Sequence, residues 1–122
     1  RDWLYVDDHA RGIDTALRKG EPGQIYNIAG ENERENIVLT RKILELTGRD
    51  ESLIKLVTDR PGHDRRYSID ASKLHALGWQ PQMPWEQGVA ETVQWHKDNE
   101  WWWRKIKSGE FKAYYERQYG NR

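Results

Sequence analysis

Residues 24–30 form an apolar segment that constrains the fold more than any other part of this chain. The segment follows a Glu-Pro-Gly turn, alternates weakly and ends at Gly30, a pattern typical of a buried strand. A buried strand needs neighbouring strands, and the sequence offers only three other short candidates, at 3–6, 53–57 and 65–70. We therefore predict an α/β or α+β fold with few short strands and several helices, part of whose surface contacts strands from elsewhere. Because the chain opens directly on a strand candidate without Met, we expect it to be a piece of a longer protein.

Residues that start and stop helices divide the rest of the chain. Carboxylates and amides favour helix starts, and glycine favours helix stops. The expected starts and stops are Asp7 or Asp8 with Gly20, Asn36 with Gly48, Asp70 with Gly78, Pro84 at the start of a further helix, and an aromatic helical tail from Trp101 to Tyr119.

Composition narrows the class of function. The 122 residues carry 20 Lys+Arg against 20 Asp+Glu, which argues against a general binder of nucleic acid or of anionic membranes. No apolar run approaches the roughly 18 residues of a membrane span. The lack of cysteine excludes disulfides and thiolate metal sites and fits a cytoplasmic protein. Seven tryptophans at a mean hydropathy of −1.06 predict an aromatic core, or an aromatic face for a ligand or partner.

The densest chemistry lies in the run Asp-Arg-Pro-Gly-His-Asp-Arg-Arg-Tyr at residues 59–67. Pro61 presets φ near about −65° and Gly62 tolerates positive φ, so a type II turn is expected over residues 60–63. Guanidinium groups bind phosphate in a bidentate way, which makes the run a candidate anion clamp with a diphosphate as an obvious ligand. The alternative is an exposed turn whose arginines pair with neighbouring aspartates.

The other groups of residues that could form a functional site give weaker indications. The four histidines form no His-x-x-x-His pair, which argues against a metal site. The sequence contains no Gly-x-Gly-x-x-Gly run, Walker loop, Ser/His/Asp order or Tyr-x-x-x-Lys pair. Trp101, Trp102 and Trp103 stand beside basic residues, as in some binders of single-stranded nucleic acid. Consecutive helical residues point about 100° apart, however, so at least one ring is expected in the core.

Six runs along the chain share one pattern. They are Arg-Asp-Trp-Leu-Tyr-Val-Asp-Asp-His at 1–9, Tyr-Asn-Ile-Ala-Gly at 26–30, Asn-Glu with Asn-Ile at 32–37, Asp-Arg-Pro-Gly-His-Asp-Arg-Arg-Tyr-Ser-Ile-Asp at 59–70, Leu-Gly-Trp with Pro at 77–81, and Glu-Thr-Val-Gln-Trp at 91–95. Read together, they resemble the C-terminal part of the dTDP-glucose 4,6-dehydratases, a family of extended short-chain dehydrogenases/reductases. The first run would fit many nucleotide-sugar epimerases and dehydratases, whereas the run at 59–67 favours the dTDP-glucose enzymes.

The resemblance implies that residues 1–122 are the nucleotide-sugar-binding C-terminal region of such an enzyme. Residues 24–30 would then complete the sheet of a Rossmann half that is absent here. That half would bind NAD and hold the catalytic residues, so the fragment alone is expected to be inactive and to bind no cofactor. The complete enzyme would be a cytoplasmic homodimer that converts dTDP-glucose to dTDP-4-dehydro-6-deoxy-glucose for deoxysugar biosynthesis of the rhamnose type, without binding nucleic acid or membrane.

The resemblance also implies a set of residues that contact the substrate. They are Arg1, Asn36, Asp59, Arg60, Pro61, Gly62, His63 and Tyr119. Arg1 and Arg60 can pair with the diphosphate, Asn36 can donate to it, and a rigid turn supplies pre-organised contacts. Two other functions stay open: another nucleotide-sugar dehydratase or epimerase of the superfamily, and a stand-alone module that binds a sugar or a partner protein.

Overall fold

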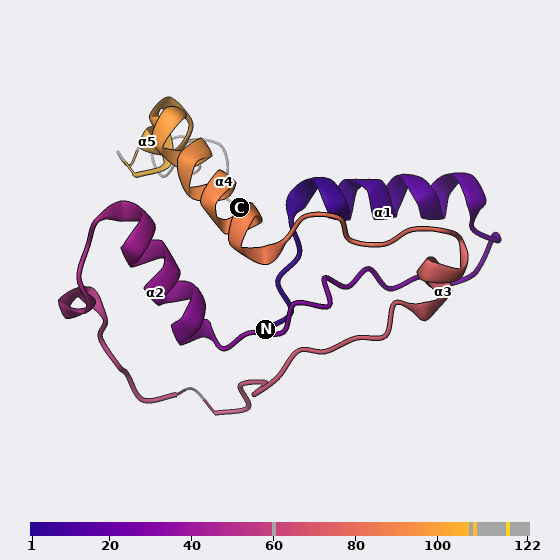
Figure 1. The fold of residues 1–122 in the computed structure, drawn as a ribbon, viewed down its shortest axis with the longest axis horizontal. Helices are drawn as coiled ribbons and strands as arrows, with labels where there is room; N and C mark the ends of the chain where they lie inside the picture. Colours follow the sequence, from indigo (N-terminus) through magenta and orange to yellow (C-terminus); the bar gives the residue numbers. More distant parts are fainter. Residues whose placement is uncertain (60, 108, 110–116, 118–122) are drawn as a thin grey trace. The chain divides into compact units, whose positions relative to one another are not determined.

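The computed structural model describes residues 1–59, 61–107, 109 and 117, and its regular elements there are helices (Figure 1). In chain order they are α1 (Val6–Lys19), α2 (Asn36–Thr47), the 3-10 helix η1 (Glu51–Leu53), α3 (Ser72–Ala76), α4 (Trp85–Asp98) and α5 (Glu100–Lys107). The chain divides into two compact units, a first unit at Arg1–Ala90 and a second unit at Glu91–Arg122. None of the helices described is both long enough and apolar enough to cross a membrane.

The predicted strands at 3–6, 24–30, 53–57 and 65–70 do not pair within the described residues. The bridges found there amount to one isolated antiparallel contact between Asp2 and Glu33, and residue 53 belongs to η1. A strand is stabilised by the N–H and C=O groups of a neighbour. Among the described residues, the segment at 3–6 has one such contact, from the N–H of Trp3 to the carbonyl of Asn32 at 3.4 Å, and no ladder of such bonds forms along any of these segments. Ile25 illustrates the consequence, because it is 78% exposed within the segment predicted to be a buried strand. The prediction of formed strands is therefore wrong for these residues by themselves.

The sequence predicts helix stops better than helix starts. Gly48 follows α2 with a left-handed φ of 64°, and Gly78 follows α3 with a φ of 89°, as glycine at these positions predicts. Asn36 was expected to cap α2, but it is the first residue of that helix. Glu35 occupies the cap position, and its side chain makes no capping hydrogen bond.

The hydrophobic core of the first unit is small and contains Trp79. Trp79 is 4% exposed and clusters with Ala29, Ala71 and Leu74. Leu74 belongs to α3, which lies beside α1 (Figure 1). An aromatic residue thus supplies much of the core volume, in agreement with the expectation from the composition.

Close backbone approach lets α1 cover the segment at 24–30. A Cβ atom added at Gly12 would lie 2.8 Å from Ile28 Cγ2 and 3.3 Å from the Trp79 ring. At the other end of α1, Lys19 Nζ donates a hydrogen bond to the backbone carbonyl of Leu77 at 3.1 Å. Residues 24–30 are therefore held by packing against a helix rather than by a sheet.

Asp8 has a structural role that the sequence did not reveal. The residue is 1% exposed, and its carboxylate accepts hydrogen bonds from the N–H groups of Gln82 at 3.0 Å and Met83 at 2.9 Å. It also pairs with Arg11, and its backbone carbonyl accepts a hydrogen bond from Trp79 Nε1 at 3.1 Å. The expected capping of its own helix is wrong for Asp8, because the carboxylate instead holds the segment before α4 against α1.

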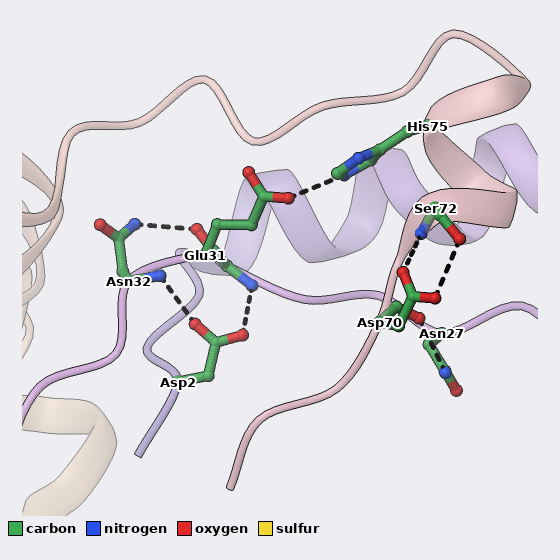
Figure 2. Close-up of polar contacts among 8 residues, drawn as sticks. Asp2, Asn27, Glu31, Asn32, Asp70, Ser72 and His75 are labelled. Carbon is green, nitrogen blue, oxygen red and sulfur yellow. Dashed lines mark hydrogen bonds and ion pairs between the residues drawn. The ribbon is translucent and has the colours of Figure 1, made fainter.

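Two further carboxylates of the first unit hold loops (Figure 2). Asp2 accepts hydrogen bonds from the N–H groups of Gly30 and Asn32, both at 2.8 Å. Asp70 accepts from the N–H of Ser72 at 2.8 Å and from its hydroxyl at 3.0 Å. These bonds from Ser72 lower the pKa of Asp70. The prediction that Asp70 caps α3 is wrong, because Ala71 occupies the cap position, and Asp70 holds the first helical residue from one position further out.

In the second unit, the three consecutive tryptophans of α5 occupy different environments. Trp103 is half-buried, and its Nε1 donates to the backbone carbonyl of His96 at 2.9 Å. Trp102 packs edge-on against Trp95, with the ring centroids 5.4 Å apart, and Trp101 is 62% exposed. The rings therefore do not form one stacking platform. Beyond α5, the structure describes only residues 109 and 117 of the predicted aromatic tail, and Tyr119 lies outside the described residues.

The role of Asp8 gives a stability prediction. Replacing Asp8 by Ala leaves the N–H groups of Gln82 and Met83 without their acceptor, so we expect the free energy of unfolding of the complete protein to fall by about 2–3 kcal/mol. Urea denaturation measures this change. The matched control is Asp7→Ala, which removes an exposed first-turn carboxylate and should cost less than about 1 kcal/mol. Equal losses in the two variants would contradict the assignment.

Candidate functional site

An open cleft of about 460 Å³ lies in the first unit. It is lined by Arg1, Glu33, Arg34, Glu35, Asn36, Arg65 and Arg66. The chain start, the start of α2 and the segment after the Pro-Gly turn all contribute to it. Four arginines against two glutamates give the lining an excess of positive charge, and the volume lies within the usual range for small-molecule sites.

Backbone hydrogen bonds hold two walls of the cleft together. The amino group of Arg1 donates to the carbonyl of Arg34 at 2.8 Å, and the N–H of Arg34 donates to the carbonyl of Arg1 at 2.9 Å. The bridge between Asp2 and Glu33 adjoins this pair, and the Asp2 carboxylate fixes the loop that leads to it (Figure 2). Arg1 is therefore positioned by its backbone before its side chain makes any contact.

The side chain of Arg1 reaches the segment after the Pro-Gly turn. Its Nη2 lies 2.8 Å from Nε2 of His63, and its guanidinium carbon lies 4.2 Å from the centre of the Tyr67 ring. Its Nη1 donates a longer hydrogen bond of 3.5 Å to the backbone carbonyl of Arg65. Residues 62 and more positions apart in the sequence thus meet at one guanidinium group.

Asp59 sets the orientation and tautomer of His63. Asp59 Oδ1 lies 2.6 Å from Nδ1 of His63, and a carboxylate only accepts hydrogen bonds, so Nδ1 carries the proton. Since the guanidinium of Arg1 only donates, Nε2 must accept from Arg1 Nη2. The geometry therefore describes a neutral imidazole that links Asp59 to Arg1.

Glu33 neutralises one arginine of the cleft. Arg66 Nε donates to Glu33 Oε2 at 2.8 Å, and a second nitrogen of Arg66 contacts the same oxygen. Hydrogen bonds from Ser68 and Arg66 lower the pKa of Glu33 below its ordinary value of 4.5. The alternative considered from the sequence was that the arginines pair with neighbouring aspartates. Arg66 does form an ion pair, but its partner is Glu33, 33 positions away, so the predicted partner is wrong.

The positive charges of the other arginines in the cleft are not balanced by a paired carboxylate of the described residues. Among the described residues, no carboxylate forms an ion pair with Arg1, Arg34 or Arg65. Arg34 lies with its guanidinium carbon 5.7 Å from the centre of the Trp85 ring and donates to the backbone carbonyl of Glu33 at 3.0 Å. An anion in the cleft would thus meet cationic groups that no internal ion pair compensates.

The structure brings together part of the site that the sequence predicts. Arg1, Asn36, Asp59 and His63 lie in or beside the cleft, since Arg1 and Asn36 line it and His63 links Asp59 to Arg1. The remaining members of the predicted turn are Pro61 and Gly62, and Gly62 has the left-handed φ of 69° that a type II turn requires at this position. Arg60 and Tyr119 lie outside the described residues.

Three cleft residues that the sequence did not predict are Glu33, Arg34 and Glu35, whereas Arg65 and Arg66 lie in the predicted anion clamp at 59–67 but not among the predicted substrate contacts. Arg65 and Arg66 belong to the run at 59–67, so their basic character was a usable signal. Arg34 carries no such signal, because the hydrogen bonds that pair it with Arg1 join residues 33 positions apart.

Asn36 brings the start of α2 to the cleft. The first N–H groups of a helix have no partner inside it, and α2 begins at Asn36. The Asn36 side chain adds an amide donor to the arginines, whereas the N–H of Val38 in the first turn donates to the backbone carbonyl of Glu35 at 3.0 Å. Among the described residues, no group of three or more His, Asp or Glu side chains could hold a metal ion. The arginines and Asn36 of the lining offer hydrogen-bond donors to an anion.

Comparisons with known proteins point to one group of enzymes. Residues 1–92 match the family described as GDP-mannose 4,6 dehydratase. The dTDP-glucose 4,6-dehydratase 1 of Escherichia coli (strain K12) is 45% identical over 130 residues, which cover 100% of this chain and 36% of the relative. A probable dTDP-glucose 4,6-dehydratase of Sinorhizobium fredii (strain NBRC 101917 / NGR234) is 47% identical over 124 residues, which cover 90% of this chain and 35% of the relative. The chain therefore spans little more than a third of the length of the curated relatives it matches.

Solved structures of the same group resemble the chain. The dTDP-glucose 4,6-dehydratase (rfbB) of Bacillus anthracis str. Ames in complex with NAD has a TM-score of 0.78 and 48% identity, covering 85% of this chain and 33% of that one. The dTDP-glucose 4,6-dehydratase DesIV of Streptomyces venezuelae with NAD and TYD bound has a TM-score of 0.79 and 44% identity, covering 84% and 32%. The helices and connecting segments described above thus recur in these two dTDP-glucose 4,6-dehydratases.

The contacts of Glu33 give a titration prediction. Ser68→Ala removes the hydrogen bond that lowers the pKa of Glu33 most, so this pKa is expected to rise toward 4.5. Because the folded pKa is the lower one, the stability that this carboxylate contributes is present above about pH 4.5 and is lost as the pH falls through the folded pKa. A 13C NMR titration of side-chain carboxyl groups measures the pKa. Ser72→Ala, the control, should change the pKa of Asp70 instead; a Glu33 pKa unaffected by Ser68→Ala would contradict the assigned contact.

Proposed function

The chain belongs to the GDP-mannose 4,6 dehydratase family, and on that premise we propose that it is the nucleotide-sugar-binding C-terminal region of a dTDP-glucose 4,6-dehydratase. The observation that carries the proposal is the cleft in which Arg1 and Arg65 keep their charge beside the start of α2. In the proposed complex, this cleft holds the diphosphate of the substrate. The complete protein converts dTDP-glucose to dTDP-4-dehydro-6-deoxy-glucose and water.

The choice of a dTDP-sugar follows the names of the similar curated proteins. Proteins named dTDP-glucose 4,6-dehydratase are 42–47% identical over 90–100% of this chain. The solved dehydratase with NAD and TYD bound has the same level of identity. The run at residues 59–67, which supplies His63, Arg65 and Arg66, also favours the dTDP-glucose enzymes.

The diphosphate suits the cleft for electrostatic reasons. Phosphate oxygens accept paired hydrogen bonds from a guanidinium fork. Arg1 and Arg65 both line the cleft, and the Arg1 guanidinium contacts the backbone carbonyl of Arg65. Asn36, which also lines the cleft, adds an amide donor at the start of α2. A positive lining also attracts an anionic substrate before contact is made.

In this proposal, the turn contributes by its fixed conformation, which four residues determine: Asp59, Pro61, Gly62 and His63. The turn is held by the Asp59–His63 hydrogen bond of 2.6 Å and by the left-handed φ of Gly62. A fixed turn loses little conformational freedom on binding, which leaves more of the contact energy for affinity. We keep Arg60 and Tyr119 as further substrate contacts on the ground of the family pattern alone.

The described residues do not fit an NAD site. Within residues 1–59 and 61–107, no strand leads through a glycine-rich turn into a helix, which is the arrangement that cradles a dinucleotide phosphate. We therefore assign NAD binding and the oxidation-reduction steps to another part of a longer protein. Residues 24–30, with their exposed Ile25, would join the sheet of that part.

The contribution of this chain to catalysis is then binding and orientation. Contacts to a remote, unreactive part of a substrate hold the reacting sugar in place, and such binding energy lowers the barrier of the chemical step. Arg1, Arg65 and Asn36 would supply these contacts at the diphosphate. No described residue is assigned to proton or hydride transfer.

A GDP-sugar is the second candidate substrate, because the matched family carries the description GDP-mannose 4,6 dehydratase. The same arginines would hold either diphosphate, since phosphates are common to both. The base, and not the cleft, would then distinguish the two substrates.

The proposal predicts both the reaction and the effect of one substitution. The complete protein with NAD should convert dTDP-glucose and not GDP-mannose, as followed by mass spectrometry of the products. Arg65→Ala removes an uncompensated cation from the cleft, so the Kd for dTDP should rise by about thirtyfold, or about 2 kcal/mol. Isothermal titration calorimetry measures the Kd.

Arg41→Ala is the matched control for this titration. Arg41 lies on α2, outside the cleft lining, and pairs with Glu51 at 2.9 Å, so its loss should leave the Kd for dTDP within about twofold of the original value. Equal effects of the two arginine substitutions would refute the diphosphate site. Turnover of GDP-mannose with no turnover of dTDP-glucose would replace the first candidate by the second.

A further inference from the structure

Resting on the proposed function, we propose that Tyr67 is a positioning residue that orients the guanidinium of Arg1 for the diphosphate. Two uncharged groups, the Tyr67 ring and the neutral imidazole of His63, hold Arg1 in place without cancelling its charge. Tyr67 ends the run at 59–67 but is not among the predicted substrate contacts.

The Tyr67 ring fixes the plane in which the guanidinium lies. The guanidinium carbon of Arg1 is 4.2 Å from the ring centre, within the distance at which a cation is attracted to an aromatic face. The ring is itself oriented, because its hydroxyl donates a hydrogen bond to Asp64, and this bond raises the pKa of Tyr67. Asp64 therefore contacts the ring's hydroxyl and not the cation.

His63 fixes the rotation of the guanidinium within that plane. Its Nε2 accepts from Arg1 Nη2 at 2.8 Å, and Asp59 holds the imidazole from the other side at 2.6 Å. A face contact restricts tilt, whereas a hydrogen bond restricts the direction of one N–H group. Together, the two contacts leave one orientation for the group.

The uncharged nature of both partners separates Arg1 from Arg66. A carboxylate, that of Glu33, holds Arg66, so its charge is compensated within the protein. In the case of Arg1, each carboxylate stands one group further away, Asp59 behind His63 and Asp64 behind Tyr67. Arg1 is thus held by uncharged groups, and it can still form an ion pair with a phosphate.

Enough donors remain on Arg1 for this purpose. A guanidinium has five N–H groups, and two of those of Arg1 are directed to His63 and to the carbonyl of Arg65. The structure records no acceptor for the other three among the described residues. Two phosphate oxygens can therefore bind in the forked manner that guanidinium favours.

The test is a double-mutant cycle on dTDP binding to the complete protein. Tyr67→Leu removes the aromatic face, so the Kd for dTDP should rise about tenfold. Because Tyr67 acts through Arg1, the same substitution in an Arg1→Ala background should change the Kd by less than about twofold. Tyr67→Phe keeps the ring and should stay within about threefold of the original Kd, because it loses only the hydroxyl that orients the ring.

Thymidine, which lacks phosphates, is the second probe. Damage to the fold would weaken the binding of both probes, whereas loss of positioning at Arg1 should weaken dTDP binding and leave the affinity for thymidine unchanged. If Tyr67→Leu does not fold, as judged by its melting curve, Tyr67→Met takes its place with the same expectation.

The outcomes separate this proposal from the proposed function. A large effect of Arg1→Ala with no effect of Tyr67→Leu would overturn the role of Tyr67 and leave the diphosphate site intact. The same would follow if Tyr67→Leu had equal effects with and without Arg1, or if Tyr67→Phe were as damaging as Tyr67→Leu. Unchanged dTDP binding in Arg1→Ala itself would count against the diphosphate site.

Discussion

The Asp2 carboxylate is the contact on which the rest of the site depends. It accepts hydrogen bonds from the N–H groups of Gly30 and Asn32. These bonds place the loop after residues 24–30 against the start of the chain (Figure 2). A Cβ at Gly30 would lie 2.4 Å from the backbone oxygen of Trp3, so the approach requires glycine. The backbone pair of Arg1 and Arg34 follows directly, and with it the position of the start of α2.

The arrangement of charge explains why this cleft suits an anion. An arginine that is held by a carboxylate is ordered but compensated, as Arg66 is by Glu33. An arginine that is held by neutral groups is ordered and still cationic, as Arg1 is by His63 and Tyr67. Order without compensation is what pre-organised binding of a phosphate requires.

The comparison with the sequence separates local from distant information. Glycine at residues 48, 62 and 78 is typical of a left-handed backbone, and the structure shows a positive φ at all three positions. The run at 59–67 likewise announces an arginine-rich turn. No local pattern predicts that Asp8 accepts hydrogen bonds from residues 74 and 75 positions away. The same holds for the backbone hydrogen bonds between Arg1 and Arg34. The strand pattern of residues 24–30 describes what the segment can form with a neighbour, and the described residues contain no such neighbour.

The central claim, that uncompensated arginines hold a diphosphate, is tested most directly by a crystal structure of the complete protein with dTDP bound. The account predicts a phosphate oxygen about 3 Å from a guanidinium nitrogen of Arg1 and another at the same distance from Arg65, with the Arg1 group still over the Tyr67 ring. A diphosphate bound away from this cleft, with Arg1 turned toward a carboxylate, would contradict it.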